Sequence, residues 1–294
     1  MKKFILVTGG CGFIGSNLIR YLLFKTKYQI ISLDNYSSGS KNKHINNKRV
    51  KYISGDTNNI ERILKSYKNN IKVVFHFGEF SRIHQSFIDT DKCFLSNISG
   101  TSKVFYFCLK NKIKIIYSAT SASLGNQGKD ESLSPYALTK SKNLELLHHL
   151  NKWFGLSYEA LYFYNVYGPG HIRVGSMATV IGIFEEQYKK KLPLTVTRPG
   201  TQTRKFTHVQ DTVEGCYYAW KKNMNKHYSL SNTKSYSIKK VASFFSKKIK
   251  MIPAKFGERG KSSIIKKIGK IKIYNLSCKT DLVSYINNFK KQTK

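Results

Sequence analysis

The sequence predicts an α/β fold, a doubly wound parallel sheet with a smaller C-terminal lobe. Through the first half of the 294 residues, short runs of β-branched and aromatic residues alternate with helical stretches. This spacing is typical of parallel sheets that carry helices on both faces. Hydrophobic residues make up 40% of the chain and aromatic residues 13%, so a sizeable core can be buried. Prolines and glycines cluster after residue 165, which predicts a loop-rich lobe there.

Each predicted strand is a short apolar run bounded by polar residues or glycine. The expected strands are 4–7, 29–33, 51–53, 73–77, 114–117 and 158–164, and the helical segments lie near 13–24, 57–68, 97–111 and 136–153. We expect a sheet domain over 1–165 and a lobe over 166–294 that closes over a substrate. Parallel sheets of this kind bind ligands beyond the carboxyl ends of their strands, so functional residues are expected directly after each strand.

Basic residues dominate the charge of the chain. Lys and Arg number 51 against 16 for Asp and Glu, which gives a net charge of +35. Such an excess favours nucleic-acid phosphates as a partner. The basic residues are mostly lysines spread through every segment, however, with no stripe, recognition motif or basic tail. A solvated, lysine-rich surface is therefore the better interpretation, and we predict no specific nucleic-acid partner.

No apolar run reaches the roughly eighteen residues of a membrane span. The N-terminal apolar run ends at residues 8–10, which is too early for a signal peptide. The cysteines are odd in number and scattered, at Cys11, Cys93, Cys108, Cys216 and Cys278, without metal-ligand spacing or a disulfide framework. The sequence thus predicts a reducing, cytoplasmic location, with no membrane partner and no bound metal.

A glycine-rich turn follows the first expected strand. Gly10, Gly12 and Gly15 satisfy the G-x-G-x-x-G spacing, and Gly9 with the last two satisfies G-x-x-G-x-x-G. Glycines allow positive φ in the turn and let a pyrophosphate approach the bare backbone at the N-terminus of the next helix. An ordinary tight strand-to-helix turn is the alternative. A strand before the pattern and a helix after it favour a Rossmann-type dinucleotide site.

Asp34 ends the second expected strand, about twenty residues beyond the turn. A carboxylate there accepts hydrogen bonds from the ribose hydroxyls of an adenosine and repels a 2′-phosphate, which favours NAD over NADP. Asp56, after the third strand, is placed to meet the adenine edge or to cap a helix. Phe77 and Gly78 close the fourth strand beside the expected path of the dinucleotide.

Tyr136 and Lys140 are separated by one helical turn, so both side chains can face one cleft. A free tyrosine has a pKa of about 10 and is a poor base at neutral pH. A neighbouring ammonium and a positively charged nicotinamide favour the phenolate, so we expect the pKa of Tyr136 to move toward the working range. Residues 118–122, after the fifth strand, offer a hydroxyl for the same substrate oxygen. A structural Tyr–Lys pair is the alternative.

In these motifs and their order, the chain resembles the extended short-chain dehydrogenase/reductase superfamily, in its NAD-dependent epimerase/dehydratase branch of nucleotide-sugar enzymes such as UDP-glucose 4-epimerase. The resemblance covers nearly the whole chain. It rests on the segments 8–15, 33–35, 55–56, 97–101, 136–140, 164–169 and 202–209. It implies an NAD-binding Rossmann domain over 1–165, a nucleotide-sugar-binding lobe over 166–294, and a homodimer.

The resemblance also implies roles for individual residues. Thr120, Tyr136 and Lys140 would be the catalytic hydroxyl, base and lysine. Asn97 would help anchor the catalytic helix and the cofactor. The implied cofactor-binding residues are Gly9, Gly12, Phe13, Ile14, Gly15, Asp34, Asn35, Asp56, Phe77, Gly78, Asn97, Tyr136 and Lys140. The implied substrate-binding residues are Asn165, Arg204, Lys255 and Glu258, which would hold the diphosphate and ribose.

Several positions depart from the family pattern. Lys255 stands where an arginine is expected, so Arg259 is an alternative source of the guanidinium. Glu79 follows Gly78 where two small residues are usual, and either Arg82 or the substrate is its expected partner. The other departures are Tyr162 at a usual arginine position, residues 198–200 before Arg204, and the short stretch between Thr120 and Tyr136.

The residues after Thr120 select among the reactions of this branch. A 4,6-dehydratase of the family carries an Asp-Glu pair there and decarboxylases use a nearby glutamate, whereas this chain has Ser121 and Ala122. The resemblance therefore implies an isomerase that inverts C4 of a UDP-sugar through a transient 4-keto intermediate, with NAD as cofactor. The alternatives are a nucleotide-sugar reductase or dehydratase, a heptose-type epimerase, a nucleic-acid-binding protein and an inactive NAD-binding scaffold.

Overall fold

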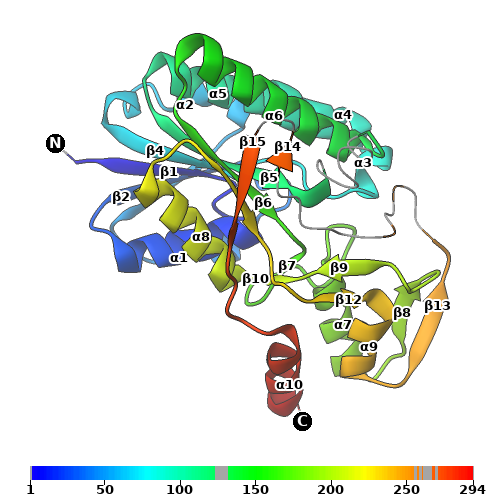
Figure 1. Cartoon of the computed structure of the whole chain (residues 1–294). Coiled ribbons are helices and arrows are strands. Elements are labelled where there is room, and N and C mark those ends of the chain that lie inside the picture. Colours follow the sequence, from blue (N-terminus) through cyan, green and yellow to red (C-terminus); the bar gives the residue numbers. More distant parts are fainter. Residues whose placement is uncertain are drawn as a thin grey trace.

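The structure is a computed structural model of the chain and describes residues 2–122, 132–254, 257, 260, 267–268 and 271–293. Its centre is a nine-stranded sheet in the order β14-β15-β11-β6-β5-β4-β1-β2-β3 (Figure 1). Its neighbouring strands are parallel except for β14 and β15, which are antiparallel. The strand order reverses between β1 and β4, as in a doubly wound fold, and this confirms the predicted class.

The six strands expected in the first half of the chain are confirmed. β5 continues to Thr120 rather than ending at residue 117, which brings that side chain to the carboxyl edge of the sheet. The strands of the sheet are β1 (Phe4–Thr8), β2 (Gln29–Asp34), β3 (Val50–Ser54), β4 (Ile71–His76), β5 (Lys114–Thr120), β6 (Tyr158–Phe163), β11 (His227–Leu230), β14 (Lys267–Ile268) and β15 (Ile271–Leu276).

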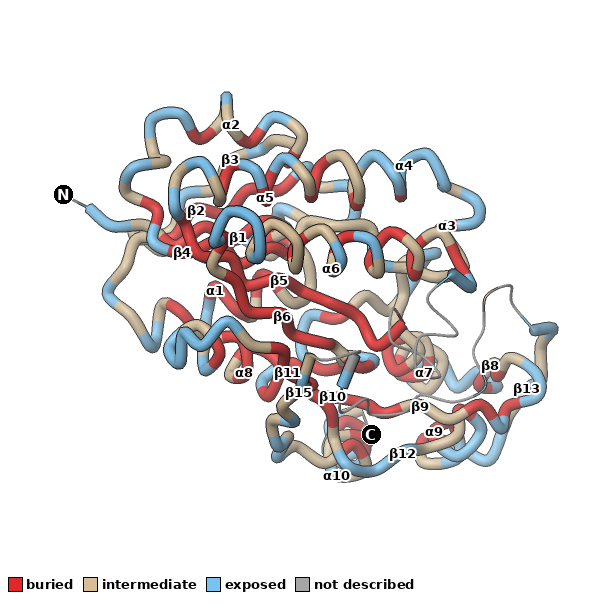
Figure 2. The backbone as a smooth tube through the Cα atoms, turned by 45° about the horizontal axis from the view of Figure 1, so that its top comes forward, coloured by how far each residue is buried: buried red, intermediate tan, exposed pale blue. Residues whose placement is uncertain are grey.

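Helices cover both faces of the sheet. α1 (Phe13–Lys25) and α8 (Val209–Lys222) pack on one face, and α5 (Thr101–Lys110) and α6 (Pro135–Phe154) pack on the other (Figure 1). Successive side chains of β1 alternate between the two cores, with Ile5 and Val7 under α1 and α8 and Leu6 under α5 and α6. Because both sides are buried, the central strands are continuous apolar runs, and this pattern makes them predictable (Figure 2).

The chain between β3 and α5 is broken into short elements. The helix expected near 57–68 is instead a 3₁₀ turn, η2 (Thr57–Asn59), followed by the single helical turn α2 (Ile60–Ile63). The helix expected near 97–111 begins as a π-helical turn, η4 (Leu95–Gly100), and continues as α5. π turns often accompany functional sites. The remaining short elements are η1 (Lys41–Lys43), η3 (Lys68–Asn70), α3 (Gln85–Ile88) and α4 (Thr90–Phe94).

Residues after 165 divide between the sheet and a smaller lobe. α8, β11, β14 and β15 belong to the sheet and its cover, and the other elements form the lobe around a core that includes Phe184, Phe245 and Phe289 (Figure 1). The division of the chain at residue 165 stays a prediction. The lobe and its connections contain β7 (Val166–Tyr167), α7 (Val180–Lys189), β8 (Leu194–Thr197), β9 (Thr203–Lys205), β10 (Thr207–His208), β12 (Ser235–Ser237), α9 (Ile238–Phe245), β13 (Ile249–Ile252) and α10 (Leu282–Thr293). No helix in the described part of the chain is long and apolar enough to cross a bilayer.

Several of the sixteen acidic residues are buried and serve as structural acceptors. Glu159 on β6 accepts hydrogen bonds from the backbone N–H groups of Met224, Asn225 and Lys226 at 2.6 to 2.9 Å. It also forms an ion pair with Lys114 at 2.8 Å. A buried carboxylate is stable only when its oxygens are bonded in this way.

Glu185 on α7 performs a similar function in the lobe. Its Oε2 lies 2.9 Å from His171 Nε2 and accepts a hydrogen bond from Arg173 Nε at 2.8 Å, and its Oε1 accepts one from Tyr285 Oη at 2.8 Å. The carboxylate is fully buried. It therefore ties α10 to the loop that precedes α7.

We predict that Glu185→Ala lowers the free energy of unfolding by about 3 kcal/mol, because it leaves the buried His171 and the partly exposed Arg173 and Tyr285 without their acceptor. Urea denaturation followed by circular dichroism measures the change. The neighbouring variant Glu186→Ala removes only a surface pair with Lys190 at 3.0 Å and should change the value by less than about 0.5 kcal/mol. Equal effects of the two variants would contradict the structural role of Glu185.

Candidate active site

A cleft with a volume of about 420 Å³ opens at the carboxyl ends of the central strands. The residues that follow β1, β2, β4, β5 and β6 all contribute to its wall, which is where the sequence analysis expected functional residues. The predicted site residues that line it are Gly9, Gly12, Phe13, Ile14, Gly15, Asp34, Asn35, Phe77, Gly78, Thr120, Tyr136, Lys140 and Asn165.

The turn between β1 and α1 leaves little room for side chains at its glycines. Gly9 has a φ of +67°, and a Cβ at Gly15 would lie 2.2 Å from the Gly9 carbonyl oxygen. Gly12 is the N-cap of α1, so no side chain caps the first N–H groups of this helix. Phe13 and Ile14, in its first turn, line the cleft. The uncapped N–H groups of a helix N-terminus beside bare backbone fit a pyrophosphate.

Asp34 ends β2 and is buried. Its Oδ2 accepts a hydrogen bond from Cys11 N and its Oδ1 accepts one from Tyr36 N, both at 2.8 Å. These bonds fix the carboxylate at the wall of the cleft, where it fits the ribose hydroxyls of NAD. The glycine turn and this carboxylate together match the adenosine and diphosphate parts of a dinucleotide.

Asn35 and Asp56 lie beside each other next to this carboxylate. Asn35 Nδ2 donates to Asp56 Oδ2 at 2.7 Å, and Asp56 Oδ1 accepts from Asn58 N at 2.9 Å as the N-cap of η2. The helix cap, which the sequence left open as an alternative for Asp56, is therefore present. A contact of Asp56 with the adenine stays a prediction.

Thr120, Tyr136 and Lys140 meet at the other end of the cleft. Ser134 caps α6 by accepting a hydrogen bond from Ala137 N at 3.1 Å, and Pro135 occupies the first turn. This start places Tyr136 at the second position of the helix, and the hydroxyl of Thr120 at the end of β5 hydrogen-bonds the phenol. The structure thus brings together the three residues predicted for catalysis.

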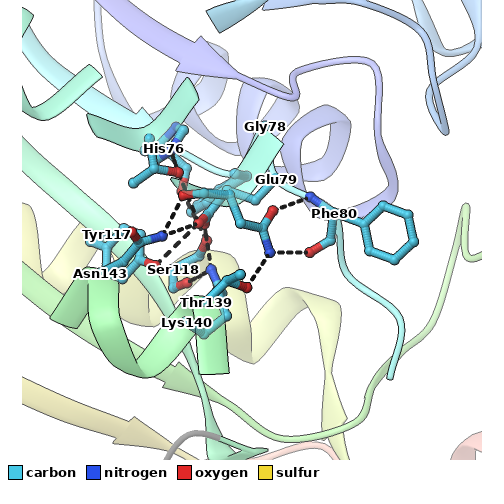
Figure 3. A network of polar contacts seen from close by, with 12 residues as sticks. His76, Gly78, Glu79, Phe80, Tyr117, Ser118, Thr139, Lys140 and Asn143 are labelled. Carbon is cyan, nitrogen blue, oxygen red and sulfur yellow. Dashed lines mark hydrogen bonds and ion pairs between the residues drawn. The ribbon is translucent and has the colours of Figure 1, made fainter. Parts of the chain in front are cut away.

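The ammonium of Lys140 is not free to act on Tyr136 alone. Its Nζ forms an ion pair with Glu79 and donates to the carbonyl of Ser118, and the two charged side chains are only 4% and 2% exposed (Figure 3). The sequence left Arg82 or the substrate as the partner of Glu79, and the structure assigns Lys140 instead. Arg82 donates its Nε hydrogen to Met177 O at 2.9 Å and lines the cleft.

The pKa of Tyr136 lies above its ordinary value in the chain alone. Burial raises it to about 12, and the charge of Glu79 adds to this increase. The hydrogen bond from Thr120 and the charge of Arg82 oppose the increase without overcoming it. The expected shift toward the working range depends on the charge of the nicotinamide as well as on Lys140, so it stays a prediction for the chain with NAD bound.

Asn97 lies behind the cleft rather than in its wall. Its Oδ1 accepts a hydrogen bond from Phe80 N at 2.7 Å, and its Nδ2 donates to Phe80 O at 3.1 Å and to Thr139 Oγ1 at 3.0 Å. It joins the loop after β4 to α6, as an anchor of the catalytic helix should. A direct contact between Asn97 and the cofactor stays a prediction.

The predicted substrate residues are only partly described. Asn165 lines the cleft, and its Nδ2 donates to Lys205 O at 2.9 Å. Arg204 lies on β9, outside the cleft wall, with its Nη1 donating to Thr203 O at 2.9 Å. Lys255 and Glu258, together with the alternative Arg259, lie outside the described residues. The diphosphate-binding roles of these residues stay predictions.

Tyr162, the departure noted at a usual arginine position, is part of the core. It is fully buried, and its hydroxyl lies 2.8 Å from His227 Nδ1. This position therefore contributes no side chain to the cleft.

Sequence reasoning missed part of the cleft wall. The segment before α7 supplies Ile172, Met177 and Thr179 to the cleft, and Phe80 and Ile83 come from the loop after β4. Thr179 accepts a hydrogen bond from Gly182 N at 3.1 Å and caps α7. A threonine before an apolar helical run is a recognisable start signal for a helix, and it could have located this wall.

Comparisons with known proteins agree with this geometry. The model of the NAD dependent epimerase/dehydratase family matches residues 5–231. A putative UDP-glucose 4-epimerase of Methanocaldococcus jannaschii is 30% identical over 74% of this chain and 74% of its own length. An ADP-L-glycero-D-manno-heptose-6-epimerase of Brachyspira hyodysenteriae is 31% identical over 71% of this chain and 69% of its own length.

A solved structure extends the similarity to the whole chain. The UDP-glucuronic acid 4-epimerase from Bacillus cereus, in complex with UDP-glucuronic acid and NAD, is 25% identical. The match covers 99% of this chain and 100% of that one, with a TM-score of 0.84.

We predict that Gly15→Ala weakens NAD⁺ binding by about tenfold or more, since the new Cβ would displace the turn and about 1.4 kcal/mol corresponds to each factor of ten. Isothermal titration calorimetry measures the affinity. The control is Gly155→Ala at the end of α6, where φ is +71° but no atom lies within 4 Å of the new Cβ. It should cost about 1 kcal/mol of stability and leave NAD⁺ binding intact. Wild-type affinity in Gly15→Ala would contradict the assignment of the turn.

Proposed function

The chain belongs to the NAD-dependent epimerase/dehydratase family, and from this premise we propose that it is a nucleotide-sugar epimerase that inverts C4 of a UDP-sugar. One observation carries the proposal. Thr120, Tyr136 and Lys140 line the same cleft as a glycine turn and a fixed carboxylate that fit NAD, so oxidation and reduction of a bound sugar hydroxyl can occur there.

The choice of epimerisation over dehydration depends on the residues beside Thr120. Ser121 and Ala122 occupy the positions next to it, and neither carries a carboxyl group. Among the described residues of the cleft wall, the carboxylates are Asp34, at the ribose end, and Glu79, which is paired with Lys140. Neither is placed to remove water from a sugar, which supports hydride return to the other face of a 4-keto sugar instead.

Tyr136 is the proposed base. Its phenol would take the proton of the sugar hydroxyl and later return it, while the Thr120 hydroxyl shares the same oxygen by hydrogen bonding. Lys140 would hold the cofactor ribose and stabilise the developing charge from one helical turn away. NAD⁺, when bound, accepts a hydride from the sugar carbon. Arg82, at the same wall, supplies a second positive charge near the phenol.

A heptose-type epimerase remains the second candidate, because the Brachyspira relative is as similar as the UDP-glucose 4-epimerase one. Incubation with NAD⁺ and a panel of UDP-, GDP-, ADP- and CDP-sugars, followed by NMR, separates the two. Inversion at C4 of a UDP-sugar supports the proposal, whereas inversion at C6 of an ADP-heptose supports the second candidate.

We also propose a homodimer, as the family resemblance implies. Large apolar side chains lie exposed on η4, α5 and the end of α6: Leu95 at 60%, Tyr106 at 61%, Trp153 at 61% and Phe154 at 64%. These elements cover the same face of the sheet (Figure 1). Exposed apolar side chains on the helices of one face suit a second copy of the chain. Light scattering should give twice the mass of 33.8 kDa, and a monomer at micromolar concentration would contradict the proposal.

A cytoplasmic location is proposed on the chemistry of the cysteines. All five are free thiols in the structure, and four of them are buried. A reducing compartment keeps such thiols intact.

Tyr136→Phe should reduce turnover at least about 100-fold, since general base catalysis contributes factors of this size. NAD⁺ affinity should stay within about twofold of wild type, because the ring and the helix cap are kept. Tyr106→Phe, on the exposed face of α5, is the matched control and should leave turnover unchanged. Full activity in Tyr136→Phe would remove the phenol from the mechanism.

A further inference from the structure

Glu79 is a charged residue of the cleft wall that the proposed chemistry does not use. It follows Gly78 after β4, and its carboxylate is almost completely buried beside Lys140. A carboxylate buried to this extent is costly unless it is paired and hydrogen-bonded. Its position one residue from the expected path of the dinucleotide makes its charge relevant to any ligand in the cleft.

Hydrogen-bond donors from three elements converge on this carboxylate (Figure 3). Oε1 accepts from Tyr117 Oη at 3.1 Å on β5, from Thr101 Oγ1 at 3.0 Å on α5, and from Asn143 Nδ2 at 3.2 Å on α6. Oε2 accepts from Lys140 Nζ and, at 3.5 Å, from Ser118 Oγ. An ionised carboxylate accepts but cannot donate, so this set of partners selects its charged form.

The same contacts fix the position of Lys140. Its Nζ donates to Glu79 and to Ser118 O and lies 4.6 Å from the centre of the Tyr117 ring. An ammonium has three N–H groups. Two of them donate to acceptors among the described residues. The direction of the third N–H group is therefore set by the positions of these two acceptors, because they hold the lysine side chain in one conformation.

Apart from Arg82, the surroundings of the pair contribute little other charge. Burial lowers the pKa of His76 to about 4 and raises that of Cys93 to about 11, so both are neutral near pH 7. Burial also raises the pKa of Tyr117 and lowers that of Lys140, although the charge of Glu79 opposes the change at Lys140. The titratable and charged groups that face the pair are His76 on β4, Cys93 on α4, Tyr117 on β5, Tyr136 on α6, and Arg82 in the loop after β4.

We propose that Glu79 is a positioning residue that holds Lys140 against Ser118 and cancels the charge of its ammonium, so that the Tyr136 phenol stays protonated until a further positive charge enters the cleft. The raised pKa of Tyr136 is consistent with this arrangement. Because the oxidised nicotinamide carries a positive charge and the reduced one does not, the pair also keeps the cleft from repelling the oxidised form. The part of this inference that concerns the protonation of Tyr136 rests on the proposed function. The part that concerns the affinities for NAD⁺ and NADH does not.

The first test measures affinities for NAD⁺ and NADH by calorimetry in wild type, Glu79→Gln, Lys140→Met and the double variant. Glu79→Gln leaves the Lys140 ammonium uncompensated, and this charge repels the positively charged nicotinamide of NAD⁺ but not that of NADH. The ratio of the Kd for NAD⁺ to the Kd for NADH should therefore rise about tenfold, the size expected for one partly shielded unit charge. Lys140→Met leaves an uncompensated carboxylate, and the ratio should fall by a similar factor. The double variant removes both charges and should return to the wild-type ratio.

The matched control for charge is Glu145→Gln. Glu145 lies on the exposed face of α6 and pairs with Lys142 at 2.8 Å, so this variant changes the net charge by the same amount far from the cleft. Its ratio should equal that of wild type. A ratio within about twofold of wild type in both Glu79→Gln and Lys140→Met would overturn the proposal. If Glu79→Gln does not fold, Lys140→Met and the double variant still measure the effect of the Glu79 charge.

The second test is the pH profile of turnover. Removing the carboxylate should let Tyr136 ionise more easily, so the half-maximal rate in Glu79→Gln should move about one pH unit lower, which corresponds to about 1.4 kcal/mol. A residue with a merely structural role would lower the rate without moving the profile, and that result would overturn the assignment. Absence of sugar turnover in every protein would contradict the proposed function, whereas the ratio of cofactor affinities would still decide the role of Glu79.

Discussion

The cleft depends on a backbone contact between the turn after β1 and the turn after β4. A Cβ at Gly9 would lie 2.8 Å from Gly78 N, and one at Gly78 would lie 3.0 Å from Gly9 N. Thr8 Oγ1 reinforces the contact by accepting the N–H groups of Phe77 and Gly78 at 3.2 and 3.1 Å. This junction lies where the strand order reverses, so the two halves of the sheet share one ligand site. It also sets the direction in which the chain enters the next residue, Glu79.

The catalytic end of the cleft is held by a second set of constraints. The start of α6 is fixed by its cap at Ser134, and Tyr136 N donates to Ser86 Oγ at 3.2 Å, so the backbone of the tyrosine is held from two sides. Asn97 ties the same helix to the loop after β4. Side chains held in this way need little reorganisation when a ligand binds, and such preorganisation is what acid–base and electrostatic catalysis require.

The sequence predicted the parts of the molecule that follow from local pattern. The strands were recognisable because both of their faces are buried, and the glycine turn, Asp34, Tyr136 and Lys140 were recognisable by spacing. Thr120 was named only through the family resemblance. The helix near 57–68 was not recognisable, because the segment that contacts α5 is a 3₁₀ turn followed by one helical turn. The ion pair between Glu79 and Lys140 joins residues sixty-one positions apart, and no local pattern encodes such a contact. Burial and, after it, the charge of Glu79 raise the pKa of Tyr136, and both depend on tertiary packing that no local pattern encodes.

The placement of the carboxylates has a consequence for the whole molecule. Asp34, Glu79, Glu159 and Glu185 are used inside the protein, whereas the lysines lie mostly at the surface, so the exterior is more uniformly cationic than the composition suggests. Mutual repulsion between exposed cations is screened over about 10 Å at 0.1 M salt. The folded chain should therefore tolerate heat better in saline than in dilute buffer, and anions such as sugar diphosphates should approach it faster as the salt is lowered.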